Sequence, residues 1–230
     1  MINLKKTRKI VAALLLAVAL VAIGVGGIAA YGLAADVPAS TSAIAEHEVI
    51  NHSLVLDEDL VLYGLVNGDI TVEAGVTLTI AAGGQVNGTV IVNGNLYLLD
   101  GGVITGAGRG AIVNLGGVFN MMGGYVRDNS YTDNGGGIWV NGGNFNMHGG
   151  RIIENTSYGG YGGGVWIDGH ESLFVLFNGE IVHNSSYFAG GGVALTNGNS
   201  DNFIMHGGLI EDNTIVHMPP PCDEPCICCP

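Results

Sequence analysis

The sequence predicts an all-β fold, a parallel β-helix that winds three short strands into each rung. Three observations lead to this prediction: a long repeat, alternating apolar residues within the repeat, and glycines or asparagines between the apolar runs. Similar segments recur at 119–129, 145–155, 174–184 and 203–213. A period of about 26–29 residues is typical of a solenoid, in which each repeat buries its apolar face only by stacking on a neighbour.

The apolar pattern within one repeat predicts strands rather than a helix. In Phe145-Asn-Met-His-Gly-Gly-Arg-Ile152, large apolar residues alternate with other residues around paired glycines, which indicates a strand, a tight bend and a second strand. A third strand follows each triple glycine, as in the segment 135–140, where Ile138 and Val140 face one way and Trp139 the other. Glycine and asparagine between the strands suit bends that need a positive φ.

Stacked rungs place equivalent residues above one another at about 4.8 Å, so like residues should form columns along the solenoid. We expect an interior column, in which each buried side chain contributes roughly 1.5–3 kcal/mol, at Phe119, Phe145, Phe174 and Phe203. We expect a structural column at a bend, where each amide bonds the next rung and the backbone of the bend, at Asn129, Asn155, Asn184 and Asn213.

The N-terminal segment has the features of an export signal. Residues 1–9 hold four of the seven basic residues, and residues 10–35 form an uncharged apolar run. This order predicts a signal peptide, and the run also exceeds the roughly 20 residues that a membrane-spanning helix needs. Segment 1–35 is therefore a signal peptide or a membrane anchor, and in both cases we expect the repeats to be secreted or displayed at the cell surface.

Three further segments complete the predicted organisation. Residues 36–53 are polar and contain proline, serine and threonine, which indicates a linker. Residues 54–217 form the β-helix, with irregular N-terminal rungs and a cap at 54–96 and regular repeats at 97–217. Residues 218–230 form a Pro/Cys-rich tail that we expect to be disordered. In an exported protein its candidates for disulfide bonds are Cys222, Cys226, Cys228 and Cys229.

The charge balance excludes one class of partner. The formal net charge is −13, and beyond residue 9 only three basic residues remain against 20 acidic ones, a balance of −17. So acidic a body argues against binding nucleic acid or anionic lipid. Membrane contact is expected only through residues 10–35, if that segment is not cleaved.

The repeats resemble a known architecture. The pattern Gly-Gly-x-Ile-x-x-Asn, present at 149–155, is followed by Gly-Gly-Gly-Val at 162–165. This order resembles the right-handed parallel β-helix repeats of bacterial and archaeal adhesin-like proteins, and it is similar in style to the repeats of polymorphic outer-membrane proteins. The resemblance covers residues 97–216 well and 54–96 loosely. It implies a right-handed, pectin-lyase-like fold but no single activity, because enzymes and adhesins share that fold.

One column could carry chemistry. Asp128, Glu154 and Asp212 share it with His183, directly before the asparagine column. Carboxylates about 4.8 Å apart could bind a cation such as Ca²⁺ or act as an acid and a base. The three carboxylates are thus the candidate catalytic residues, and the favoured alternative is a solvated edge. Polysaccharide lyases of this fold imply a basic residue over such a cluster, and no motif gives Arg127 or Arg151 that role.

No resident cofactor or metal is expected. His148 and His206 share one column, but Phe177 lies between them, which would separate the histidines by about 9.6 Å, two strand spacings. A metal ion shared by this pair is therefore not predicted, and both histidines are expected at the surface.

Aromatic residues outside the core are the candidate ligand-binding residues. They recur in the loop after the asparagine column and on the third strand, at Tyr131, Trp139, Tyr158, Trp166 and Tyr187. Exposed rings could bind sugars or a protein, since their faces are apolar and their tips polar. The alternative is that these rings cover one another and shield the glycine-rich bends.

These patterns lead to three functional hypotheses. The first is a non-enzymatic, adhesin-like β-helix that binds glycans or cell-surface partners. The second is a polysaccharide-degrading lyase or hydrolase that uses the acidic column, and the third is a structural stalk. The sequence leaves the oligomeric state open.

Overall fold

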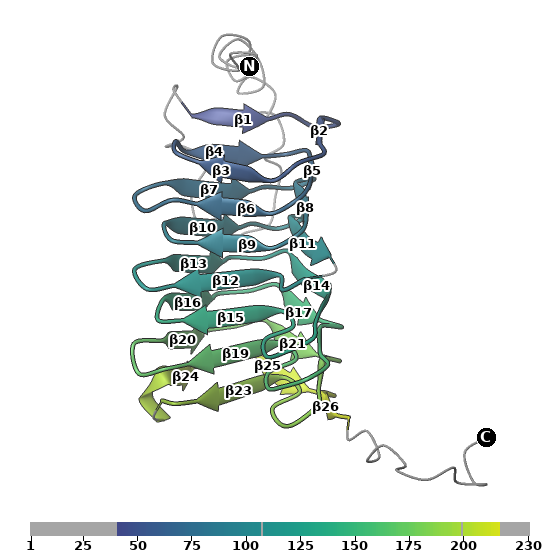
Figure 1. The fold of residues 1–230 in the computed structure, drawn as a ribbon, viewed down its shortest axis with the longest axis vertical. Coiled ribbons are helices and arrows are strands. Elements are labelled where there is room, and N and C mark those ends of the chain that lie inside the picture. Colours follow the sequence, from purple (N-terminus) through teal and green to yellow (C-terminus); the bar gives the residue numbers. More distant parts are fainter. Residues whose placement is uncertain (1–40, 107, 199, 217–230) are drawn as a thin grey trace, which may run out of the picture.

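The structure is a computed structural model that describes residues 41–106, 108–198 and 200–216, and it is a right-handed parallel β-helix (Figure 1). The strands form three parallel sheets, which we call A, B and C. A rung is one circuit of the chain through the three sheets. Seven rungs contribute a strand to every sheet, and the last described rung contributes to sheets A and B.

Sheet A contains, in spatial order, β1 (Ser42–Ile44), β4 (Leu60–Leu62), β7 (Thr77–Ile80), β10 (Asn95–Leu98), β13 (Val118–Met121), β16 (Asn144–Met147), β20 (Leu173–Leu176) and β24 (Phe203–Met205). Sheet B contains β2 (Val49–Ile50), β5 (Leu65–Asn67), β8 (Gln85–Asn87), β11 (Val103–Gly106), β14 (Tyr125–Tyr131), β17 (Arg151–Ile153), β21 (Glu180–Val182) and β25 (Leu209–Glu211).

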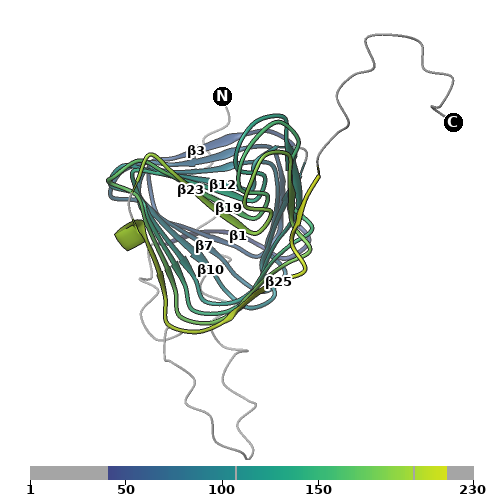
Figure 2. The same cartoon turned by 90° about the horizontal axis from the view of Figure 1, so that it is seen from below.

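Sheet C contains β3 (Leu54–Leu56), β6 (Ile70–Val72), β9 (Val90–Val92), β12 (Ala111–Asn114), β15 (Ile138–Asn141), β19 (Val165–Asp168) and β23 (Val193–Thr196). A small fourth sheet continues from the end of β14 through β18 (Thr156–Ser157), β22 (Ser185–Ser186) and β26 (Thr214–Ile215). Viewed along the axis, the three main sheets enclose a three-sided core, and the later loops curl outward at the corner between sheets B and C (Figure 2).

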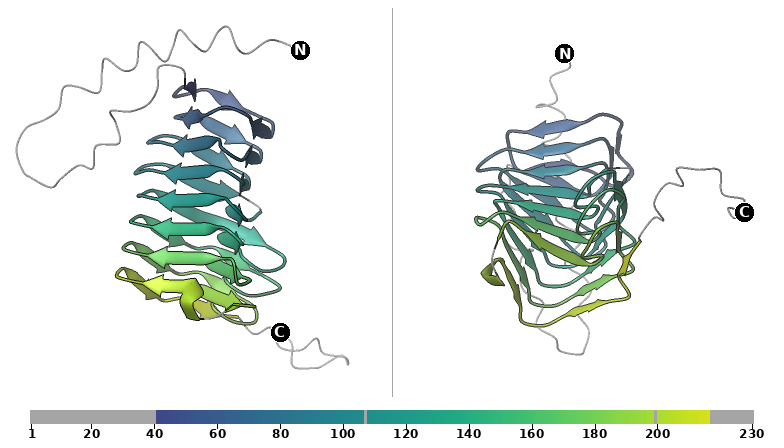
Figure 3. Two further views of the ribbon diagram at one scale, coloured as in Figure 1. Left: turned by 90° about the vertical axis from the view of Figure 1, so that its left-hand side faces the viewer. Right: turned by 60° about the horizontal axis from the view of Figure 1, so that its bottom comes forward.

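Like residues stack along the interior. Phe119, Phe145, Phe174 and Phe203 are partners in the sheet A register, with ring centroids 4.9, 4.6 and 5.0 Å apart. The first three rings are completely buried. The sequence period therefore identified a true spatial column, and the side views show the rungs stacked directly above one another (Figure 3).

The solenoid begins earlier than the sequence predicts. Strands β1 and β2 lie inside the segment expected to be a linker, 36–53, so that boundary is wrong. β1 pairs in register with β4 and buries Ile44 completely, but one inward apolar residue in such a short strand produces no alternation that can be recognised in the sequence. The early rungs are also more regular than expected, because Leu60, Leu78 and Leu96 continue the phenylalanine column without a shift.

Two predicted segments lie outside the described residues. They are the signal peptide or membrane anchor at 1–35 and the tail at 218–230 with its four cysteines. In the part of the chain that is described, no helix is both long enough and apolar enough to cross a bilayer.

Candidate functional site

The candidate site is the outward corner between sheets B and C in the later rungs, which we call the aromatic corner. It comprises seven aromatic residues, Tyr131, Trp139, Tyr158, Tyr161, Trp166, Tyr187 and Phe188. The corner exists because the later rungs insert extra residues there. Only residues 68 and 69 separate β5 from β6, whereas the whole segment 154–164 separates β17 from β19.

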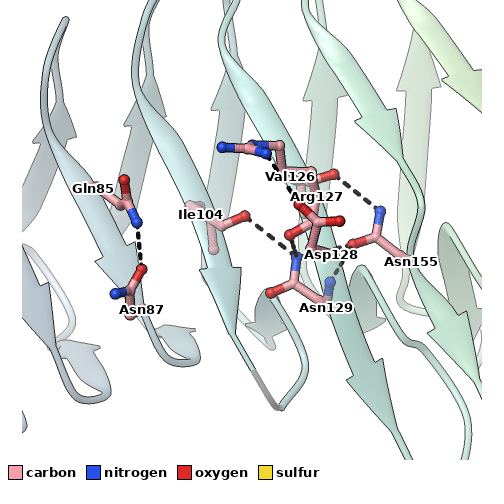
Figure 4. A network of polar contacts seen from close by, with 8 residues as sticks. All are labelled: Gln85, Asn87, Ile104, Val126, Arg127, Asp128, Asn129 and Asn155. Carbon is pink, nitrogen blue, oxygen red and sulfur yellow. Dashed lines mark hydrogen bonds and ion pairs between the residues drawn. The ribbon is translucent and has the colours of Figure 1, made fainter.

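A buried asparagine ladder anchors the inner side of this corner. Asn129, Asn155 and Asn184 are completely buried, and each donates its Nδ2–H to the Oδ1 of the next asparagine at 2.9–3.0 Å. Each Oδ1 also accepts the backbone N–H of the preceding asparagine, as Asn155 does from Asn129 at 3.1 Å. Figure 4 shows this pair together with the carbonyl of Val126, which accepts from Asn155 at 2.9 Å. The ladder thus satisfies the backbone of a buried bend.

The ladder begins at Asn129, because glycine occupies the equivalent position in the preceding rung. Gly106 is the register partner of Asn129. With no amide beneath it, the Oδ1 of Asn129 is a buried acceptor without a hydrogen bond, while its Nδ2 donates to the carbonyls of Ile104 and Arg127 (Figure 4).

The acidic column precedes the ladder and has an unusual backbone. Asp128, Glu154, His183 and Asp212 all have left-handed φ values between 53° and 57°. All four side chains are exposed, and the carboxylate of Asp128 forms an ion pair of 3.1 Å with Arg127. Repeated left-handed φ values at non-glycine residues identify this column as the turn that aims the next residue, an asparagine, into the core.

The proposed chemistry of this column stays a prediction. Catalysis by Asp128, Glu154 and Asp212 and binding of Ca²⁺ are not tested by the geometry. Within the described ranges, no three histidine, cysteine or acidic side chains come close enough together to share a metal ion.

Triple glycines let the corner loops fold back onto sheet C. A Cβ atom on Gly163 would lie 2.2 Å from the carbonyl oxygen of Ser185, so a larger residue cannot replace it without a shift of the backbone. Gly135 and Gly162 pack against the tryptophans, since a Cβ on Gly162 would lie 2.7 Å from the Cβ of Trp166. The loops therefore cover the outward face of the sheet at this point.

The two tryptophans form a covered stack. Trp139 and Trp166 are register partners on β15 and β19, with ring centroids 5.0 Å apart and planes inclined by 18°. Trp166 is only 8% exposed and donates its Nε1–H to Thr196 Oγ1 at 2.8 Å. The tryptophans point out of the barrel as the sequence predicts. Their faces nevertheless lie under the loops, which corresponds to the shielding alternative for this pair.

Arg109 closes the stack from the preceding rung. Its guanidinium carbon lies 3.8 Å from the ring centre of Tyr131 and 4.6 Å from that of Trp139. Its Nε–H donates to the carbonyl of Asn134 at 2.9 Å, and desolvation lowers the pKa of Arg109 against the opposing influence of Tyr131 and Asp133. The sequence offers no signal for this role, because a single arginine lies far along the chain from the rings that it contacts.

Other rings of the corner face the solvent. Tyr158 is 58% exposed, Phe188 55% and Tyr161 37%. Phe188 lies 5.8 Å from Tyr161 and meets Tyr187 edge to face at 4.8 Å. The exposed rings thus belong to two neighbouring rungs and contact one another across them. Tyr161 and Phe188 are not among the predicted ligand-binding residues, although both lie close in the sequence to the recurring tyrosines.

A second group of rings lies at the corner between sheets A and B. Phe177 stacks between His148 and His206, with centroids 4.5 and 5.3 Å from the two imidazoles. This is the order predicted from the shared column, and all three rings are exposed. Beside them, an open groove of about 490 Å³ is lined by Asn178 and by the ion pair of Arg151 with Glu180, whose atoms lie 2.7 Å apart.

The chain was compared with family models, with curated proteins and with solved structures, and it matches none of them. The parallel β-helix architecture therefore stands on the strand pairing itself. The resemblance to adhesin-like repeats rests on the sequence motifs alone.

Proposed function

We propose that this chain is an exported, non-enzymatic β-helix protein that binds glycans or a cell-surface partner through the exposed rings of the aromatic corner. One observation carries the proposal: Tyr158, Tyr161 and Phe188 are solvent-exposed, while Trp166 of the same corner is only 8% exposed and packs closely against Gly162. Aromatic rings lose little conformational entropy on binding when their loops are fixed. Their apolar faces can pack against the face of a sugar ring or against an apolar protein surface.

The proposal assigns different roles to the five predicted ligand-binding residues. Tyr158 would contact the ligand directly, and Tyr187 would hold Phe188 through their edge-to-face contact. Tyr131, Trp139 and Trp166 would form the support, since Arg109 covers Tyr131 and the loops cover the tryptophans. Substitution of an exposed ring should therefore weaken binding without unfolding the protein.

Binding of the full-length chain to a glycan array and to intact cells tests the proposal. Tyr158→Ala and Phe188→Ala should each weaken binding by about two- to tenfold, the loss expected for one aromatic contact. Tyr125→Ala is the matched control, because Tyr125 is 39% exposed on sheet B away from the corner, and it should bind like the wild type. Equal binding by all three variants would refute the assignment to the corner.

The same measurements separate the other hypotheses. An enzyme would release reducing or unsaturated sugar ends from a polysaccharide and would lose that activity on Glu154→Ala. A structural stalk would neither bind nor cleave. The export part of the proposal rests on residues 1–35 alone, and it would fail if cell fractionation found the chain in the cytoplasm.

A further inference from the structure

The outer face of sheet A combines a lack of charge with a polar surface. Its strands point alternate residues inward and outward, and the outward residues form two columns. One column runs through Ala43, Val61, Thr79, Tyr97, Asn120, Asn146, Val175 and Ile204. The other runs through Thr77, Asn95, Val118, Asn144 and Leu173. No residue of either column carries a charge.

This lack of charge distinguishes the face from sheet B, whereas sheet C also has an uncharged outward column, which runs from Val55 to Ala194 and is apolar except at Thr71. The chain as a whole has a formal net charge of −13, and the strands of sheet B carry Arg127, Arg151, Glu180 and Glu211. Acidic residues instead occupy the turns that border sheet A, as Asp59 does before β4 and Asp100 does after β10. An anionic polymer would be repelled at these borders, so a ligand of this face should be neutral.

The chemistry of the face suits sugar hydroxyls better than a second protein surface. Apart from Val118, its central rungs present hydroxyls and amides, at Thr77, Thr79, Asn95, Tyr97, Asn120, Asn144 and Asn146. Cores of protein interfaces are more apolar than these rungs. In the apolar part of the column, Val175 is only 8% exposed and Ile204, at the last strand, is 39% exposed. Amides and hydroxyls both donate and accept hydrogen bonds, as sugar hydroxyls do.

The face is also regular and partly preorganised. Its side chains repeat from strand to strand at about 4.8 Å along the solenoid axis, which suits an extended polymer more than a compact ligand. Asn146 donates its Nδ2–H to Asn120 Oδ1 at 3.1 Å, so the two amides hold each other in a fixed orientation. Fixed donors and acceptors reduce the entropy lost on binding.

From these observations we propose that the outer face of sheet A binds a neutral, extended polysaccharide lying along the solenoid axis. This inference rests on the proposed glycan-binding function and adds both the ligand class and a second contact surface, separate from the aromatic corner. Tyr97 would pack against a sugar ring, and the neighbouring amides would bond its hydroxyls.

Co-sedimentation of the full-length chain with cellulose and chitin, and affinity electrophoresis in polygalacturonate, test the inference. The wild type should bind a neutral polymer and migrate unretarded in the anionic one. Tyr97→Ala should weaken binding about tenfold, the effect of losing one good contact. Asn146→Asp should weaken it similarly, since it adds a charge to the face at almost constant shape.

The matched control is Asn87→Asp, because Asn87 is an outward asparagine whose amide donates to Asn67 at 2.7 Å, but on sheet B. It should bind like the wild type, and thermal unfolding should show that all three variants are folded. Retardation in polygalacturonate, no binding to either neutral polymer, or equal binding by Tyr97→Ala and the wild type would overturn the inference. If binding is lost instead on Tyr158→Ala, the proposed function survives and only this surface is wrong. If the wild type binds no glycan by any assay, the proposed glycan-binding function falls as well.

Discussion

The early and late rungs bury the same kind of core but differ at a single corner. The interior column passes through Leu60, Leu78 and Leu96 in the early rungs, and through Phe145, Phe174 and Phe203 in the late ones, where each circuit uses a longer stretch of chain. Sheets A, B and C continue through both regions without a break. The additional residues lie mainly between sheets B and C, where they form the left-handed turn, the buried ladder, the fourth sheet and the aromatic loops.

This difference shows that cross-section and rung length are controlled separately. The inward columns determine the cross-section, because every rung must match the side chains above and below it. The corner tolerates extra residues because its new backbone groups are bonded by the asparagine ladder and by the fourth sheet. The predictions below test that separation, in order of decreasing expected effect.

Asn155→Ala should be the most damaging of these substitutions. It removes the acceptor of the Asn129 amide and the donor to the Val126 carbonyl in a completely buried bend. With about 1–3 kcal/mol for each unsatisfied group, we expect a loss of about 3–5 kcal/mol in the free energy of unfolding, measured with denaturant.

The early rungs provide the control for that prediction. Asn87→Ala removes the amide of an outward ladder that is only part-buried, and it should cost less than about 1 kcal/mol. Similar losses for Asn155→Ala and Asn87→Ala would mean that the buried ladder does not support the late corner in the way described.

Arg109→Met should have an intermediate effect. Methionine keeps the apolar stem but loses the cation over Tyr131 and the hydrogen bond to Asn134, so we expect a loss of about 1–2 kcal/mol and a change in tryptophan fluorescence. Arg127→Met is the control, because Arg127 forms only an exposed ion pair, and it should change stability by less than about 0.5 kcal/mol. Unchanged stability and fluorescence in Arg109→Met would show that the arginine does not hold the stack.

Glu154→Gly should have the smallest effect and the opposite sign. A non-glycine residue at a φ of 57° is strained by about 1–2 kcal/mol, and glycine relieves this while adding entropy to the unfolded chain. We expect a gain of up to about 1 kcal/mol, seen as a higher midpoint in denaturant. Glu154→Ala removes the same carboxylate but keeps the strain, so a gain there of equal size would point to charge rather than to backbone.

Much of the fold could be predicted because equivalent residues repeat in the sequence. The spacing of Phe119, Phe145 and Phe174 predicts the sheet A register, and the recurrence of Asn129 predicts a column at a bend, which the structure contains. The position of the residue with a left-handed φ is harder to predict from the sequence. Positive φ was expected at glycine and asparagine, but in the ladder turns it falls on the residue before the asparagine, such as Glu154.

The candidate site was harder to predict, because it depends on how loops fold over a sheet. The alternation of apolar residues correctly predicts that Trp166 points outward. No local pattern in the sequence predicts that the loop containing Gly162 lies against it. The contact of Arg109 with Tyr131 joins residues on different rungs without any repeated motif. The start of the solenoid was missed for a related reason, since β1 buries a single isoleucine.

Two of the late rungs have the same number of residues, which bears on how the solenoid could lengthen. Segments 145–173 and 174–202 are equal in length, and each supplies one rung with a phenylalanine of the interior column and an asparagine of the buried ladder. In-frame duplication of either segment should therefore lengthen the protein by about 4.8 Å and continue both the phenylalanine column and the asparagine ladder. Each such copy would also add one set of exposed rings, so the length of the solenoid and the number of its binding positions would increase together.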